Sequence, residues 1–310
     1  MKRIKGLINN NNFLLNMFYR YNTLRNFFTH LFYSDKKRIS KHWKNYFSNK
    51  IDFDHPKTLN EKIQWLKVND RRDIHTLLAD KFASRKYISE NFGDEYLVPL
   101  LFVTDKVRLL NKTHITEVPF IVKPNNGSGL YKIYRNFDDV NWKHLRRDAR
   151  TWLKRRYYEE SQEWQYKNMK PLIVVEKLLT DKFGKIPNDY KLHFINGKFV
   201  FIYCAIDREG ENYRNIYDLD WNLLPFSWSG HKSVNVGNAI SKPKTFAKML
   251  EIGEFIAKDF AYVRVDFFEV DGKLYCGEIT FHHGSGYDKF DPPHFDKMYG
   301  DLLDLGIENL

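Results

Sequence analysis

The sequence predicts a mixed α/β protein of the α+β class, with helices in the first third of the chain and antiparallel strands in much of the rest. Up to about residue 118, apolar residues recur mostly at helical spacing. From about residue 119, short β-branched runs alternate with glycine-containing turns. Asn196-Gly197 lies between two apolar runs, which is the strongest short-range signal for a β-hairpin. These hairpins favour the α+β class over a doubly wound parallel sheet.

The first 50 residues form a basic, aromatic arm on a nearly neutral body. They contain 11 Lys and Arg against one acid, Asp35, whereas the remainder contains 39 Lys and Arg against 38 acids. A neutral body argues against nucleic-acid binding. The arm is typical of peripheral contact with a membrane. The alternative is a solvated helix pair that covers the lobe beneath it.

Cysteine use and hydropathy indicate a folded protein of a reducing compartment. Cys204 and Cys276 both lie in apolar runs, and neither belongs to a CxxC motif. No apolar run approaches the length of a membrane span. Asparagines interrupt the apolar part of the first 18 residues, so we interpret this segment as retained. We therefore expect a cytoplasmic protein, with peripheral association at the inner face of the cytoplasmic membrane as an option for the arm.

Local signals place three helices. Thr58 is followed three residues later by Glu61, the spacing of a capping box, which predicts a helix start in segment 55–70. Segment 74–93 resembles one further helix that ends near its final glycine. Segment 243–260 has an apolar stripe at helical spacing.

The hairpin at 262–281 contains a carboxylate in each apolar strand, Asp266 and Glu278. A two-residue loop would place them on opposite faces, because side chains alternate along a strand. A three-residue loop with Gly272 in the left-handed conformation pairs Glu269 with Lys273 and restores the parity. We therefore expect one face to contain Arg264, Asp266, Cys276, Glu278 and Thr280.

Two acids on a diagonal of this hairpin could share a divalent cation. Magnesium is favoured, because it prefers hard oxygen ligands and accepts one or two carboxylates together with substrate phosphates. In the alternative interpretation, each acid pairs with a nearby Arg or Lys. The adjacent His282 and His283 are a poor chelating pair for a transition metal, because neighbours on a strand point to opposite faces.

A lysine and a glycine-rich loop are the features expected for a phosphate site. Lys123 ends a β-branched strand and precedes Asn125–Gly129, in which Gly127, Ser128 and Gly129 can turn backbone N–H groups toward an anion. No GK[ST] follows, so this is not a Walker A loop. Taken alone, the segment is also compatible with a simple hairpin, and Glu176 with the end of an ordinary buried strand.

The ordered motifs resemble a known family. "PKTLNEKIQWLK", "LADKFASRKYI", "VVEKLL", "DYKLHFINGK" and "YVRVDFFEVDGKLYCGEITF" are similar to ATP-grasp ligases, such as D-alanine–D-alanine ligase and the RimK-type enzymes. The set is most similar to the TupA-like ATP-grasp proteins of bacterial surface-polysaccharide gene clusters, from about residue 54 to 305. The resemblance implies an ATP-grasp fold, with two α+β subdomains clasping the nucleotide after a mainly helical N-terminal region. Its parts are an arm (1–50), a helical lobe (51–118), a subdomain with a glycine-rich flap (119–178) and a subdomain with the metal-binding hairpin (179–310).

The resemblance also implies a role for each group of motif residues. The implied ATP-binding positions are Lys123, Gly127, Ser128, Gly129, Glu176, Lys177, Leu179 and Asp189. The implied catalytic cations are Lys191, Arg214 and Arg264. The implied Mg²⁺ ligands are Asp266, Glu278 and Thr280. Thr280 stands where typical relatives carry Asn, and its neutral hydroxyl is a weaker ligand for a second metal ion.

The implied activity is an ATP-dependent carboxylate–amine ligase that forms an acyl phosphate and then an amide, releasing ADP and phosphate. Its expected partners are an amino acid and a sugar or glycan acceptor, in the biosynthesis of capsule, O-antigen or a teichuronic-type polysaccharide. A metal-dependent glycosyltransferase of the same pathway is one alternative. A catalytically inactive ATP-grasp fold that serves as a binding module is another.

Overall fold

The computed structural model describes residues 25, 28–29, 31–229 and 239–307. Most of the predicted N-terminal arm therefore lies outside the described residues. The helices that the argument uses are α3 (Asp35–Phe47), α4 (Leu59–Asn69), α5 (Asp73–Ala79), α6 (Ser84–Phe92), α7 (Trp142–Lys154), α8 (Tyr157–Ser161), α9 (Phe246–Ala257) and α10 (His294–Leu302). The strands are β1 (Leu100–Thr104), β2 (Phe120–Pro124), β3 (Lys132–Tyr134), β4 (Ile173–Lys177), β5 (Asp189–Ile195), β6 (Lys198–Ile206), β7 (Tyr213–Tyr217), β8 (Ser227–Ser229), β9 (Tyr262–Val270), β10 (Lys273–Thr280) and β11 (Lys289–Asp291).

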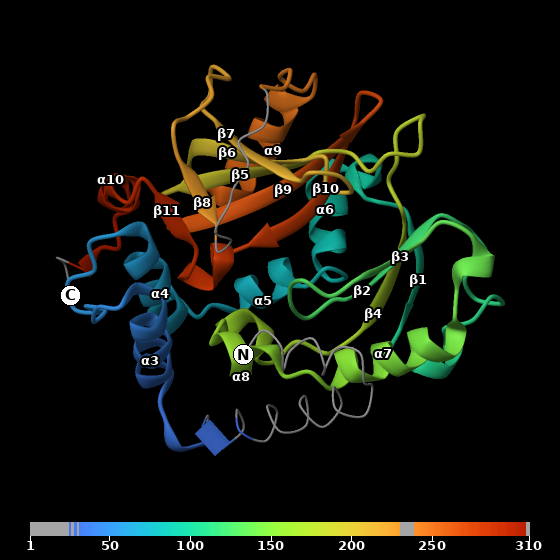
Figure 1. The fold of residues 1–310 in the computed structure, drawn as a ribbon, viewed down its shortest axis with the longest axis horizontal. Coiled ribbons are helices and arrows are strands. Elements are labelled where there is room, and N and C mark those ends of the chain that lie inside the picture. Colours follow the sequence, from blue (N-terminus) through green and yellow to red (C-terminus); the bar gives the residue numbers. More distant parts are fainter. Residues whose placement is uncertain (1–24, 26–27, 30, 230–238, 308–310) are drawn as a thin grey trace.

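Two antiparallel sheets form the framework of the molecule (Figure 1). The first sheet has the strand order β1-β4-β2-β3, and the second has the order β10-β9-β5-β6-β7. Strands β8 and β11 form a separate short ribbon. The predicted hairpin at Asn196-Gly197 is confirmed, because it joins β5 to β6 and both turn residues have positive φ.

Each sheet has its own hydrophobic core. Helix α7 covers the first sheet, with Leu145 and Ala149 packed among its apolar strand residues. Helix α9 covers one face of the second sheet, and Met249 and Ile252 lie in that core. On the other face, α4, α10 and the β8–β11 ribbon bury only the end near Tyr262. The rest of this face carries polar side chains.

Helix α4 begins as predicted. The Thr58 side chain accepts from the Glu61 N–H, and the Glu61 carboxylate accepts from the Thr58 N–H, which completes the capping box. The prediction of one helix over 74–93 is wrong. The chain breaks between α5 and α6 because Asp80 accepts from the backbone N–H groups of Phe82 and Ala83, a local alternative to continued helix.

The register of the β9–β10 hairpin also differs from the prediction. Val270 pairs with Lys273, so the loop has two residues, Asp271 and Gly272, both with positive φ. The three-residue loop is therefore wrong. A β-bulge at Gly277 nevertheless returns Glu278 to the same face of the sheet as Asp266, because two residues of β10 occupy the space of one on β9.

The bulge decides which side chains share a face. Asp266 lies directly opposite Glu278, and Arg264 lies opposite Thr280, so these four share one face as expected. Cys276 pairs with Phe267 and packs with the α9 core, so its predicted place beside Asp266 is wrong. Cys276 precedes the bulge, so its side chain still points to the face opposite that of Asp266.

None of the helices in the described part of the chain has the length and apolar character that crossing a bilayer requires.

Candidate active site

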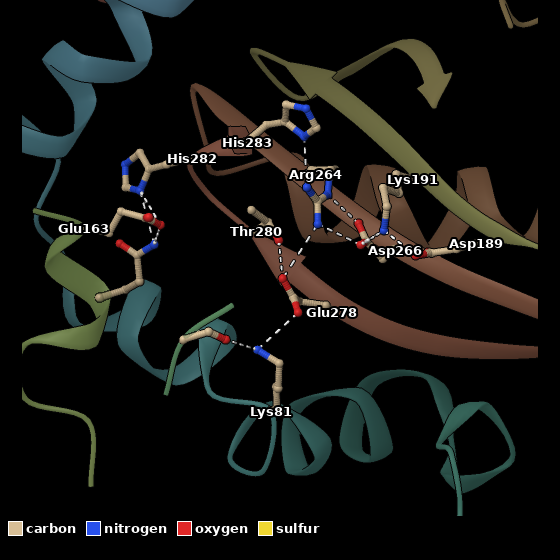
Figure 2. Close-up of polar contacts among 12 residues, drawn as sticks. Lys81, Glu163, Asp189, Lys191, Arg264, Asp266, Glu278, Thr280, His282 and His283 are labelled. Atoms are coloured by element: carbon tan, nitrogen blue, oxygen red, sulfur yellow. Dashed lines mark hydrogen bonds and ion pairs between the residues drawn. The ribbon is translucent and has the colours of Figure 1, made fainter. Parts of the chain in front are cut away.

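A row of charged side chains crosses three neighbouring strands of the second sheet. Glu278 on β10, Asp266 on β9 and Lys191 on β5 are successive cross-strand partners, so their side chains leave the sheet together. Lys191 Nζ lies 2.6 Å from Asp266 Oδ2 and 2.5 Å from Asp189 Oδ2 (Figure 2). The pairing of β9 with β5, 75 residues away in sequence, thus assembles the row.

Arg264 holds the Asp266 carboxylate from beside it. Its Nε donates to Oδ1 at 2.6 Å and its second terminal nitrogen donates to Oδ2 at 2.8 Å, a bidentate ion pair. The other terminal nitrogen lies 2.9 Å from His283 Nδ1. Burial, with Arg264 and Lys191, lowers the pKa of His283 well below its usual value, so the neutral ring can accept this bond. These contacts match the alternative interpretation, in which each acid of the hairpin pairs with a nearby Arg or Lys.

Glu278 is held by three neighbours. Thr280 Oγ donates to Oε1 at 2.8 Å, Lys81 Nζ lies 3.1 Å from Oε2, and Arg264 lies 3.7 Å from Oε1. Burial alone would raise the pKa of Glu278. The positive charges of Lys81, Arg264 and Lys191 outweigh it and hold the pKa well below its ordinary value. Glu278 is therefore a carboxylate at neutral pH.

Lys81 connects the carboxylate row to the glycine-rich loop. Besides Glu278, Lys81 Nζ contacts the carbonyl oxygen of Gly127 at 2.7 Å. It lies in the break between α5 and α6, so the Asp80 turn that stops α5 also aims Lys81. Asp80 Oδ2 accepts from the side chain of Asn125 at 2.8 Å, which fixes the base of the same loop.

The first sheet contributes an ion-pair cluster of its own. Lys123 Nζ lies 2.6 Å from Glu176 Oε2, and Arg85 of α6 lies 3.2 Å from Glu176 Oε1. A small cavity of about 20 Å³ is lined by Lys81, Arg85 and Glu176 together with Asp266 and Glu278. Arg85 of helix α6 therefore lies between the charged residue Glu176 of the first sheet and the carboxylates of the second sheet.

The glycine-rich loop has the backbone that its glycines predict. Gly127 and Gly129 have φ values of +137° and +76°. A side chain on Gly127 would meet the Tyr157 ring at 3.2 Å, whereas Gly129 faces open space. Ser128 is exposed.

The backbone after Glu176 is partly engaged. The N–H groups of Lys177 and Leu178 donate to the carbonyls of Pro99 and Pro119 at 2.9 and 3.0 Å. In the described chain, the N–H of Leu179 has no hydrogen-bond partner. Leu179 is thus the position of this segment with an N–H group available to a ligand.

A larger cleft of about 740 Å³ opens on the Lys191 side of the row. It is lined by Asp189, Lys191, Arg208 and Arg214 on the sheet. Arg214 donates to the backbone carbonyl of Tyr213 at 2.9 Å and to the side chain of Asn212. Arg214 lines the cleft from β7, which is three strands away from β9 in the sheet, so the sheet does not place it beside Asp266.

The donor set fits magnesium in its chemistry. The described residues contain no group of three or more His, Cys, Asp or Glu side chains placed to hold a metal ion. Asp266 and Glu278 are nevertheless opposed carboxylates, and the Glu278 oxygens are held by a hydroxyl and a lysine that a cation could displace. His282 contacts Gln165 and Glu163, away from His283, in agreement with the expectation for neighbours on an extended chain (Figure 2).

The sequence interpretation assigns no role to Lys81, Arg85 and Arg208, and it considers His283 only as a metal ligand, not as a partner of Arg264. The sequence predicts one continuous helix through "LADKFASR", but Asp80 is a helix-stop signal that marks the turn containing Lys81. The other three have no local signal, because long-range packing brings them to the row.

Residues 61–304 match the model of the TupA-like ATP-grasp family, which covers most of the chain. The chain belongs to the TupA-like ATP-grasp family. The expected family and its mixed α+β, ATP-grasp fold are therefore confirmed. A search of curated proteins returns no significant match.

Solved structures similar to this TupA-like protein are ATP-grasp ligases of low identity. D-alanine–D-alanine ligase from Bacillus anthracis complexed with ATP is 16% identical, with 70% of this chain and 55% of that chain covered and a TM-score of 0.38. PsnB complexed with its minimal precursor is 12% identical, with coverages of 71% and 59% and a TM-score of 0.40. D-alanine–D-alanine ligase from Helicobacter pylori is 19% identical, with coverages of 74% and 62% and a TM-score of 0.38. This chain thus spans less than two thirds of these proteins' length.

Proposed function

We propose that this protein is an ATP-dependent carboxylate–amine ligase that joins an amino acid to a sugar unit of a cell-surface polysaccharide. The observation that carries the proposal is the charged row formed by Glu278, Asp266 and Lys191. Glu278 and Asp266 line the same small cavity as Arg85 of α6 and Glu176, the ion-pair partner of Lys123. Two carboxylates beside several cations form a site for a metal-bound polyphosphate.

In this proposal, the nucleotide lies between the two sheets. Lys123 and the N–H groups of the 127–129 loop contact its phosphates, and Glu176, Lys177 and Leu179 receive the adenine. The available N–H of Leu179 supports this placement. We propose that Asp189 lies near the ribose, and the support for this is its Oδ1, which is buried without a hydrogen-bond partner in the described chain.

Asp266 and Glu278 would hold Mg²⁺, with the Thr280 hydroxyl beside them. The metal would neutralise charge on the phosphates when bound. Asp266 remains anchored by Arg264, so Glu278 is the group that must exchange Lys81 for the metal.

In the proposed reaction, the cationic side chains of this protein neutralise negative charge. A substrate carboxylate oxygen bonds to the γ-phosphorus of ATP, the bond from that phosphorus to the β–γ bridging oxygen breaks, and ADP leaves. The product of this step is an acyl phosphate. The amine then attacks its carbonyl carbon, phosphate leaves, and the amine's proton passes to solvent. Lys191 and Arg214 offset the negative charge of the transferring group. Arg264 positions Asp266.

The first experiment is calorimetric titration with ADP, with and without Mg²⁺. Wild-type protein is expected to bind Mg·ADP, and Glu278→Gln should lose at least about tenfold of the Mg²⁺-dependent affinity, because a direct oxygen ligand becomes a weaker one. Glu254→Gln, an exposed change on α9, is the matched control. Equal affinity with and without Mg²⁺ would contradict the metal site.

The second experiment tests the reaction. ADP release from ATP should require both a carboxylate and an amine, supplied as a panel of sugar acids, amino sugars and amino acids. ATP turnover that is indifferent to every such pair would refute the ligase. No observation among the described residues favours the glycosyltransferase, and the intact charge row argues against an inactive binding module.

The described part of the arm supports a proposal of peripheral membrane contact. Leu31 and Phe32 are exposed, and Lys37 and Lys41 are exposed on the helix that follows. Apolar side chains next to lysines fit an anionic lipid surface. Sedimentation with phosphatidylglycerol vesicles that is lost in Leu31→Ser/Phe32→Ser would support it, and unchanged sedimentation of this variant would refute it.

A further inference from the structure

The 740 Å³ cleft has two unlike walls. One wall is the charged sheet face at Asp189 and Lys191, and the other is formed in part by α3, through His42, Asn45 and Tyr46. Helix α3 ends at Phe47, before the residues that match the family begin at 61. This wall is therefore a feature of this chain that the family match does not account for.

The cleft lies where a substrate other than ATP would meet the ATP phosphates in the proposed function. Lys123 and Glu176 do not line it, whereas Lys191 does. Its volume is in the range of pockets that enclose small organic ligands. The charged row thus separates the region assigned to adenine from a cleft large enough for another molecule.

The α3 wall presents an aromatic surface. Tyr46 stacks on Tyr287 with ring centroids 4.9 Å apart and an interplanar angle of 28°, and His42 lies edge-on to the same ring. Tyr287 is buried, but Tyr46 is 53% exposed and lines the cleft, so its ring is covered on one side only. An open aromatic face attracts polarised C–H groups, because its quadrupole is negative.

The polar side chains that α3 itself adds beside this ring are uncharged, whereas the charged side chains of the cleft come from other elements. Within the described chain, the Asn45 amide makes no side-chain hydrogen bond, and neither does the ring of His42. Burial, with the neighbouring cations Lys67 and Arg38, lowers the pKa of His42 and keeps the ring neutral. An aromatic face beside neutral donors and acceptors suits hydroxyl groups better than an ammonium or carboxylate group.

The wall is held rigidly. Asp35 at the start of α3 accepts from Arg71 at 2.6 Å and from the Tyr158 hydroxyl at 2.5 Å. Behind Tyr287, the buried Lys67 lies 5.0 Å from its ring centroid and donates to the Ser285 carbonyl at 3.0 Å. A preorganised aromatic surface binds with less loss of side-chain entropy.

We propose that α3 forms the specificity wall of a second-substrate site, and that Tyr46 stacks on a polyhydroxylated ring, that is, a sugar unit. This inference rests on the proposed function, because it takes the cleft as the place where the second substrate meets the γ-phosphate. It goes further in assigning the recognition of the sugar to a helix outside the family-matched residues.

The test is saturation-transfer-difference NMR on the full chain with Mg·ADP present. The probes are methyl β-glucoside, glucuronic acid and glucosamine, with uridine and alanine as competing classes. At least one sugar should receive saturation, and Tyr46→Ala should weaken its binding about five- to tenfold. Tyr46→Phe should stay within about twofold of wild type, because it keeps the ring. Tyr33→Ala, an equally exposed tyrosine that does not line the cleft, is the matched control.

Each other outcome is informative. Unchanged sugar binding in Tyr46→Ala, or saturation of uridine or alanine in place of the sugars, would overturn the inference. Equal loss in Tyr46→Phe and Tyr46→Ala would assign the effect to the hydroxyl and also overturn it. Melting temperature and Mg·ADP affinity establish that each variant is folded. If the wild-type protein binds a sugar but not Mg·ADP, the proposed function alone is refuted. If it binds Mg·ADP but no sugar, this inference alone is refuted.

Discussion

At the scale of single residues, the candidate site is a balance of buried charges. Asp266 is neutralised by Arg264 and Lys191, and Glu278 by Lys81. Removing one partner from such a set leaves an uncompensated charge, which is far more costly than the net value of the pair. Because of this imbalance, Asp266 variants should lose stability as well as activity, whereas Glu278 is partly exposed and better suited to test function.

Lys81 offers a prediction at this scale. Lys81→Met removes the contact to Gly127 O and the cation beside Glu278. We expect kcat/KM for ATP to fall about ten- to a hundredfold, the equivalent of the charge-assisted hydrogen bond to the Gly127 carbonyl, because Lys81 keeps this contact when Mg²⁺ takes its place beside Glu278. The 125–129 loop should also be cleaved faster in limited proteolysis.

Lys86→Met is the control, because Lys86 is exposed on α6 and pairs only weakly with Glu90 at 3.6 Å. If Lys81→Met and Lys86→Met behave alike in both assays, the bridging role of Lys81 is wrong.

At the scale of elements, the β9–β10 hairpin shows how one residue sets the chemistry of a face. Its tight turn alone would place Asp266 and Glu278 on opposite sides of the sheet. The bulge at Gly277 corrects the parity and also brings the two acids directly opposite each other, closer than the expected diagonal.

Gly277→Ala tests the bulge. The added methyl group would meet the Phe268 ring at 2.9 Å and the Asp266 carbonyl at 3.2 Å. We expect a loss of about 1–3 kcal/mol in the free energy of unfolding, as for other overpacked sites, together with weaker Mg·ADP binding. Urea denaturation and calorimetry measure the two effects.

Gly272→Asn in the turn of the same hairpin is the control. Gly272 has φ of +79° with open space around it, and Asn tolerates this conformation. Its effect on unfolding should stay within about 0.5 kcal/mol, as for other exposed changes. Unaltered stability and Mg·ADP affinity in Gly277→Ala would show that the bulge has no such role.

At the scale of the whole molecule, the N-terminal helices join the two sheets rather than standing apart. Helix α4 packs into the core on the polar side of the second sheet (Figure 1). The side chain of Arg85 on α6 contacts Glu176 of the first sheet. The division into four parts at 50, 118 and 178 remains a prediction.

Lys67 reports on how α4 docks against the 283–287 loop. Its side chain is fully buried, and desolvation lowers its pKa from 10.5 to about 8, although Glu163 and Asp35 oppose the shift. Between pH 8 and 10.5, the unfolded chain therefore binds more protons at Lys67 than the folded chain does. Stability contributed by this group rises with pH across that window.

We expect the difference in unfolding free energy, wild type minus Lys67→Met, to increase from pH 8 to 10 by at most about 1.4 kcal/mol per pH unit. Urea denaturation across this range measures it, and the other titrating groups cancel in the difference. Lys57→Met, at an exposed lysine, should show no slope. A flat or falling difference for Lys67→Met would mean that the lysine is not desolvated in the folded protein.

The sequence by itself determined the features that neighbouring residues decide. Thr58 and Glu61 cap α4, and Asn196-Gly197 turns the β5–β6 hairpin, because each signal acts within a few residues. The ordered motifs also identified the family and brought Asp266, Glu278 and Lys191 into one hypothesis.

Only the tertiary structure decided the register of the acids, the contacts of Lys81 with Gly127 and Glu278, and the second wall of the cleft. The bulge at Gly277 is a feature of how β10 pairs with β9, and the contact of Tyr46 with Tyr287 joins residues 241 positions apart in sequence. Local spacing carries no information about such contacts, because they exist only when distant segments bury their apolar surfaces together.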